Sequence, residues 1–356
     1  MSVELTKLQN FWINLHPIIR NGPCPSDYKT MNIKKVIKYL ISAALAIVLL
    51  WLSFRDVEWD DFVKGFSECS WGFVLMSMAA GAVSFWVRGL RWRRLLLPID
   101  DSISRKTTFN GINIANLTNF ALPRLGEFVR CGVVVRHSKD GKATFKNVLG
   151  TVILERIWEL LVMVMLIGLV ILFRIDRFGD FFYKEIWLAS LERFDQNVWL
   201  FLLGCILSVC LCVWMIWKFR SRNRFCGRIV SFVKGILQGF SSCMRMPKKW
   251  IFLAQTVLIW LIYWFMLAAI MWSLPATADL GLIDALFLSL IGGLGFLVPV
   301  PGGFGAYHFI ITMSLSMIYG IPEHIGFVFA TLSHSSQAIT QIIFGACSYA
   351  YETLKR

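Results

Sequence analysis

The sequence predicts an all-α protein that crosses a membrane several times, and three observations support this fold class. Hydrophobic residues make up 57% of the 356-residue chain, and the mean hydropathy is +0.63. Soluble domains contain only about 45–50% apolar residues. The apolar stretches are continuous rather than alternating, which favours helices over a membrane β-barrel. Basic residues gather at the ends of these stretches, as the positive-inside rule predicts for cytoplasmic loops.

The basic residues also bear on partners, since the net charge is +14. Their position beside apolar stretches favours anionic lipid headgroups over nucleic acid, which we do not expect to bind. Nine cysteines are scattered through the chain without a CxxC pair. They predict neither a disulfide framework nor a metal site.

We expect the chain to consist of a cytoplasmic N-terminal extension, residues 1–32, and one transmembrane domain, residues 33–356. The extension lacks the basic and apolar regions of a signal peptide. A first span at 36–54 follows three lysines, which place the N-terminus in the cytoplasm. Residues 55–70 carry five acidic side chains and predict an amphipathic helix on the outer surface. A second span, 71–90, then ends in arginines.

Residues 107–137 have basic residues at both ends and a proline, Pro123, in the middle. They predict a re-entrant hairpin that is entered from the cytoplasmic side and turns at Pro123 and Gly126. Four amides recur every third residue on its first arm and predict a broad polar face: Asn110, Asn113, Asn116 and Asn119. This face either lines a polar cavity or joins neighbouring helices.

The chain after the first hairpin is predicted to contain four more spans and an interfacial helix at 225–246. The spans are residues 146–173, 198–217, 250–273 and 325–350. Residues 282–320 are interrupted and predict a second re-entrant hairpin, entered from the opposite face. The residues expected to form its turn are Pro299, Pro301, Gly302, Gly303 and Gly305. They permit close backbone approach and expose half-helix ends that could meet an anion, or they only form a packing bend.

These elements give about six full spans and two hairpins arranged as an inverted repeat, an architecture typical of transporters. Counting each hairpin differently gives eight spans. The last span ends in Lys355 and Arg356, which places the C-terminus in the cytoplasm. We therefore expect a multi-pass protein of the bacterial inner membrane with both termini in the cytoplasm.

Charged residues near the first turn are the main candidates for a binding site. Arg124, Glu127 and Arg130 are spaced by three residues, so we expect them to share one helical face. Two guanidiniums could hold a lipid phosphate through paired hydrogen bonds. Alternatively, the three residues only fix the hairpin, in an ion-pair cluster with charged residues of the next span: Glu155, Arg156 and Glu159.

Secondary polar candidates lie near the second turn: His308, His334 and Gln337. Paired histidines could bind a metal or relay protons. Because no carboxylate or third ligand stands at motif spacing, hydrogen-bonded interior histidines are the favoured interpretation, and we predict no metal or cofactor. Motifs of hydrolases and nucleotide-binding proteins are missing from the sequence, and no segment is long enough for a soluble catalytic domain. Enzyme activity is therefore not expected of this chain itself.

Three motifs together resemble the lysylphosphatidylglycerol synthase transmembrane family, also called flippase-like. They are N-x(2)-N-x(3)-P-R-x-G-E-x(2)-R at residues 116–130, Glu155-Arg156, and P-x-P-G-G-x-G at residues 299–305. The resemblance implies translocation of a phospholipid or polyprenyl-linked headgroup between leaflets. It also implies that five charged residues belong to the functional centre: Arg124, Glu127, Arg130, Glu155 and Arg156. With two amides of the first hairpin, Asn116 and Asn119, they make up the predicted headgroup site.

The chain departs from the family in one place, because Tyr307 and His308 stand where an acidic residue often follows the glycine turn. An alternative function also remains open. The chain could be the membrane subunit of an aminoacyl-phosphatidylglycerol synthase, or of another lipid- or glycan-modifying enzyme, whose transferase is a separate chain.

Overall fold

The computed structural model describes residues 44–45, 47–52, 59–139, 141–173, 207–208, 211, 214–215, 218 and 249–354. Every regular element within these residues is a helix, which confirms the all-α fold. The chain forms two compact units, one of residues 1–153 and 250–356 and the other of residues 154–249. The predicted N-terminal extension, the interfacial helix at 225–246 and most of the span at 198–217 lie outside the described residues.

Three described helices are long and apolar enough to cross a membrane: α4 (Trp71–Leu96), α7 (Phe145–Phe173) and α12 (Lys249–Ser273). They coincide with predicted spans. The long helix α16 (Glu323–Leu354) covers the last predicted span, and the short helix α3 (Trp59–Ser67) lies within the predicted amphipathic segment. The structure thus supports a polytopic membrane protein, while the exact number of spans stays a prediction.

The first predicted hairpin consists of α5 (Arg105–Ala121) and α6 (Gly126–Arg136), which pack against each other. Helix α5 begins where the Ser104 hydroxyl accepts a hydrogen bond from the Thr107 backbone N–H at 3.0 Å, a typical N-cap. It ends before Pro123, as the sequence predicts. The two arms approach so closely that a Cβ on Gly126 would overlap the carbonyl group of Ala115.

The second predicted hairpin consists of α14 (Leu282–Gly295) and α15 (Ala306–Tyr319), which follow the short helix α13 (Pro275–Ala278). Between its two arms lies a single 3-10 turn, η3 (Pro301–Gly303). Positive φ angles occur in this connection at Gly302 (59°), Gly303 (81°) and Gly305 (79°). Only glycine adopts such angles readily, so the glycine-rich motif is what lets the chain turn here.

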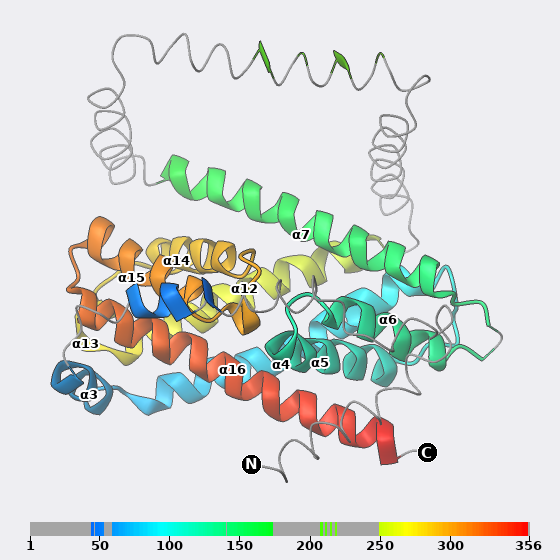
Figure 1. Ribbon diagram of the computed structural model, residues 1–356, viewed down its shortest axis with the longest axis horizontal. Coiled ribbons are helices and arrows are strands. Elements are labelled where there is room, and N and C mark those ends of the chain that lie inside the picture. The colour runs from blue at the N-terminus through cyan, green and yellow to red at the C-terminus, as the bar shows by residue number, and fades with distance from the viewer. Residues whose placement is uncertain are drawn as a thin grey trace. The chain divides into compact units, whose positions relative to one another are not determined.

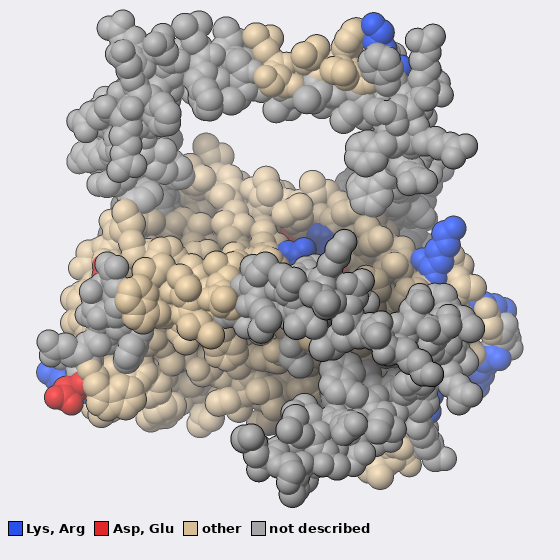
Figure 2. Space-filling model, viewed as in Figure 1, with Lys and Arg blue, Asp and Glu red and all other residues tan. Residues whose placement is uncertain are grey.

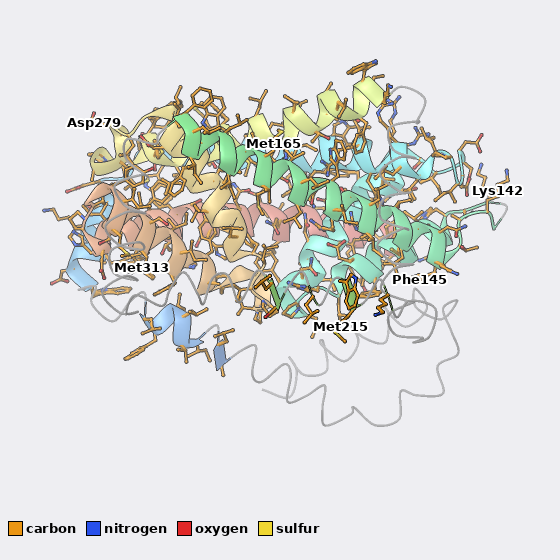
Figure 3. All side chains as sticks on the ribbon, turned by 90° about the horizontal axis from the view of Figure 1, so that it is seen from above. Lys142, Phe145, Met165, Met215, Asp279 and Met313 are labelled. Atoms are coloured by element: carbon orange, nitrogen blue, oxygen red, sulfur yellow. The ribbon has the colours of Figure 1, made fainter. Side chains whose placement is uncertain are left out.

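The two hairpins enter their unit from opposite ends. Figure 3 shows Lys142, in the loop after α6, and Asp279, in the loop before α14, at opposite ends of the helices. In Figure 1, α16 extends alongside both hairpins, and it packs against α5 and α15 as well as α3 and α4. This is the arrangement that the sequence predicts for hairpins entered from opposite faces. Their orientation relative to a membrane stays a prediction.

Charged side chains lie mostly at the ends of the helices. Figure 2 shows Lys and Arg gathered near one end and the charges around α3 near the other, while most of the described surface between them is uncharged. A band of this kind suits contact with lipid acyl chains. A few Lys or Arg atoms are nevertheless visible between the two ends (Figure 2), where a cation needs a protein partner, water or a polar ligand.

Candidate functional site

The turns of the two hairpins contact each other. A guanidinium nitrogen of Arg124, in the first turn, donates a hydrogen bond of 2.6 Å to the backbone carbonyl of Leu297, in the second. The rings of Phe120 and Phe304 lie 6.3 Å apart across the same contact. We refer to the connections at 122–125 and 296–305 as the first and second elbow. Segments almost 180 residues apart in the sequence are thus in contact.

Arg124 has an unusual backbone conformation. Its φ of 66° makes it the one non-glycine residue with positive φ among the described residues. Such a conformation costs on the order of 1–3 kcal/mol, and it occurs most often at functional sites. The side chain is exposed and uses one N–H group on Leu297, so other N–H groups of the guanidinium can reach a ligand.

The expectation that Arg124, Glu127 and Arg130 share one helical face is wrong for Arg124. Helix α6 begins only at Gly126. Arg124 precedes it and has a positive φ angle, so its backbone does not continue the helix. Glu127 and Arg130 do share a face, since they form an ion pair of 2.6 Å within α6.

Arg130 lies in the interior of its unit, with a side chain that is only 1% exposed. Its guanidinium lies over the indole ring of Trp92, on α4, at 4.7 Å from the ring centroid. The indole N–H of Trp92 donates in turn to the Thr151 hydroxyl at 3.0 Å. A buried cation needs such partners. In this conformation Arg130 joins α6 to α4 and does not present its charge to a headgroup.

The four amides of α5 divide into two groups. Asn110 and Asn119 make structural bonds: Asn110 donates to the Glu352 carboxylate at 2.7 Å, and Asn119 accepts from the Gly126 backbone N–H at 2.8 Å. Asn113 is fully buried, and neither atom of its amide has a hydrogen bond, nor does the amide nitrogen of Asn116. Two amides therefore stitch helices together, as one of the two interpretations predicts, and two keep unused hydrogen-bonding capacity.

The charged residues of α7 belong to the other unit. Arg156 and Glu159 form an ion pair of 2.8 Å within the helix, and Glu155 is buried. Their association with the elbows, and hence their part in a headgroup site, stays a prediction.

The polar candidates of the second hairpin lie behind the second elbow. A ring nitrogen of His334, Nε2, is 2.9 Å from the carbonyl oxygen of Gly302, and the ring of His308 lies 5.0 Å from that of His334. Gln337 donates to the Ser77 hydroxyl of α4 at 3.4 Å, so it joins two helices. Within the described residues, no group of three metal-ligating side chains gathers here or elsewhere.

Three groups that make contacts near the elbows are not predicted as site residues from the sequence: Trp92, the Leu297 carbonyl, and Ser333, whose hydroxyl lies 2.7 Å from that of Tyr307. A backbone carbonyl carries no sequence signal. Trp92 follows the arginine Arg91 in a basic helix end, where it resembles an interfacial anchor. Ser333 shares a polar face of the last predicted span with Gln337, a pattern that does not single out either residue.

Asp100 fastens the base of the first hairpin, outside the membrane-spanning helices. Its carboxylate accepts from the Ser102 hydroxyl at 2.6 Å and from the Ser138 hydroxyl at 2.5 Å. These hydrogen bonds, that of Ser102 first, lower the pKa of Asp100 below its usual value because they favour the ionised form. The loop before α5 and the loop after α6 are thereby joined.

Comparison with known proteins identifies one family. The model of the family described as Lysylphosphatidylglycerol synthase TM region matches residues 37–345, which include both elbows. No curated protein and no solved structure matched the chain.

Proposed function

Because the chain belongs to the Lysylphosphatidylglycerol synthase TM region family, we propose that it moves a phospholipid or lipid-linked headgroup from one membrane leaflet to the other. We place it in a bacterial inner membrane with both termini in the cytoplasm. Two hairpins entered from opposite ends support this proposal, since transporters of several folds bind their substrates where broken helices meet.

One observation carries the proposal: the exposed guanidinium of Arg124 at the contact between the elbows. A headgroup phosphate matches the geometry of a guanidinium and forms stronger hydrogen bonds with it than a neutral carbonyl does. A phosphate that reached Arg124 would replace the carbonyl of Leu297 as its acceptor. Binding of the headgroup would therefore release the second elbow from the first and open the way between them.

Glu127 and Arg130 have a supporting part in this mechanism. Their ion pair and the indole of Trp92 hold α6 against α4, so that the first elbow has a fixed base. The Asn119 carbonyl that accepts from Gly126 fixes the start of α6 in the same way. Asn116, whose amide nitrogen has no hydrogen bond, is the second group we assign to the headgroup.

The proposal is tested in reconstituted vesicles with a phospholipid whose headgroup can be modified from outside. Arg124→Ala removes the charge-assisted bonds, worth about 1.5–3 kcal/mol, so translocation should fall about 10- to 100-fold. Arg124→Lys should retain part of the rate. Arg136→Ala, which removes an exposed arginine at the far end of α6, is the matched control and should be normal. Equal rates for Arg124→Ala and the control would refute the role of Arg124.

A second candidate function is that of a membrane subunit for a lipid-modifying enzyme whose transferase is a separate chain. The family description favours it, since it names a synthase region. Lipid analysis of cells without this chain separates the two. Loss of a modified lipid points to the enzyme subunit, whereas an unchanged set of lipids with altered exposure between the leaflets points to translocation.

A further inference from the structure

The second elbow is hydrogen-bonded to α16 through the side chain of His334. Its Nε2 atom lies 2.9 Å from the Gly302 carbonyl oxygen. A carbonyl can only accept, so Nε2 carries the hydrogen and Nδ1 holds a lone pair in the neutral ring. Gly302 also packs against Phe120, in the last turn of α5 beside the first elbow, since a Cβ on Gly302 would meet the Phe120 ring at 2.7 Å. His334 therefore supports the contact between the elbows.

A second imidazole lies within reach of the first. The ring centroids of His308 and His334 are 5.0 Å apart, and both residues are only 3% exposed. The Nδ1 atom of each ring is buried without a hydrogen-bond partner. Aromatic rings enclose the pair: Phe296, Phe304, Tyr307 and Phe327. Two buried nitrogens without partners are costly in an apolar site, which indicates that they serve another state of the protein.

Charged groups near the pair are few among the described residues. From α15, the titratable neighbours are His308 itself and Tyr307, whose hydroxyl is bonded to Ser333. From the first elbow, Arg124 contacts the neighbouring carbonyl of Leu297. Near Phe62 of α3, which contacts Phe327, the described charged side chains are exposed: Asp60 and Lys64 within the helix, and Glu68 just after it. Helices α4 and α5 also pack on α16, and their charged residues follow Val87 or precede Thr107, away from the elbows.

We propose that His308 and His334 form a proton-binding site that controls the second elbow. A proton from water adds to the Nδ1 lone pair of His334, and the new N–H bond needs an acceptor, which the Nδ1 lone pair of His308 supplies. One proton is then shared by two imidazoles, and repulsion excludes a second. The shared bond requires the His334 ring to turn toward His308. That turn breaks its hydrogen bond with Gly302 and frees the elbow.

This inference reaches beyond the proposed function, because it supplies a coupling between proton uptake and the movement of the second hairpin. It also depends on two side chains that the headgroup mechanism does not use. Proton binding can be measured without any transport, so the two proposals can fail separately.

The first experiment follows the imidazoles by NMR in ¹⁵N-histidine-labelled protein held in lipid nanodiscs, over about pH 4 to 8, where imidazole titrates. We expect His308 and His334 to respond as one coupled site and the Gly302 carbonyl signal to change with them. His308→Phe removes the acceptor, so the midpoint of His334 should fall by at least about one pH unit. His308→Leu, which also lacks a ring nitrogen, serves if the Phe variant does not fold. His324→Gln, on the same helix, should leave the midpoint unchanged.

Three outcomes would each overturn the proposal. The two rings could titrate independently, neither ring could take up a proton over this range, or the Gly302 carbonyl signal could stay unchanged while the rings titrate. A second measurement uses the pH dependence of translocation. His334→Gln keeps an N–H donor for Gly302 but takes up no proton, so its rate should no longer vary with pH as that of the natural protein and of His324→Gln does. Equal pH profiles in all three proteins would also overturn it.

Discussion

Two arginines of the same motif show how neighbours decide what a residue does. Arg124 and Arg130 are six positions apart, yet the first is exposed at the contact between the elbows and the second is buried against Trp92 and Glu127. A cation in an apolar interior must be paired, whereas a cation at an opening can exchange one acceptor for another. The geometry therefore separates the headgroup contact that we propose for Arg124 from the structural ion pair of Arg130, six residues further along the chain.

The burial of Arg130 leads to a prediction about stability. Arg130→Met removes the guanidinium from the ion pair with Glu127, and breaking a fully buried pair from one side costs about 3–5 kcal/mol, less here because the Glu127 side chain is 20% exposed. We expect a lower midpoint of thermal unfolding in detergent or nanodiscs. The double variant Arg130→Met with Glu127→Gln should recover much of the loss, because it also removes the negative charge that Arg130 offsets. Equal midpoints for the natural protein and the single variant would contradict the structural role.

The hydrogen bonds of Asp100 predict how stability depends on pH. Because its pKa is lowered in the folded protein, ionised Asp100 contributes stability that is fully present above its unfolded pKa of about 3.9. This contribution is lost as the pH falls through the lower, folded value. Asp100→Asn lacks it at every pH. The difference between the unfolding midpoints of the two proteins should therefore be constant at neutral pH and shrink below about pH 4, and a difference that persists there would contradict the assignment.

At the scale of the elements, the sequence predicts the two hairpins and their breaks because proline, glycine and flanking charges act locally. Pro123 and the motif at 299–305 end helices wherever they stand. The contacts between these elements could not be predicted in the same way, because they do not depend on local sequence. Arg124 with Leu297 and Asn110 with Glu352 join residues far apart in the chain. The positive φ of Arg124 could not be predicted either, since arginine has no preference for this conformation. For this reason the expectation of a continuous helical face was wrong at Arg124.

Close packing of the first hairpin gives a prediction at this scale. Gly126→Ala places a methyl group against the Ala115 carbonyl, so the arms must separate, and overpacking of this kind costs about 1–3 kcal/mol or more. Gly150→Ala, where a Cβ meets nothing within 4 Å, is the matched control. It should be neutral or gain about 0.5–1 kcal/mol, as alanine is the better helix former. Similar unfolding midpoints for both variants would show that the arms are not closely packed.

At the scale of the unit of residues 1–153 and 250–356, transport requires the contact between the elbows to open. A short thiol-specific crosslinker between Phe120→Cys and Phe304→Cys, whose rings lie 6.3 Å apart, should stop translocation because it holds the elbows together. Each single variant treated in the same way is the control, since the chain has cysteines of its own. Undiminished translocation in the crosslinked double variant, verified by mass spectrometry, would show that the elbows need not separate.

Helix α16 connects the second elbow to the base of the first hairpin, so an opening of the elbows can affect both hairpins. In its first half it touches the second elbow through His334. In its last turn Glu352 accepts a hydrogen bond from Asn110 and lies 3.2 Å from His137, both near the base of the first hairpin. The two attachment points are eighteen residues apart, about 27 Å along a continuous helix. While both hydrogen bonds are in place, a shift of α16 along its axis moves both contacts together. The turn of one hairpin and the base of the other are therefore coupled until the bond between His334 and Gly302 breaks.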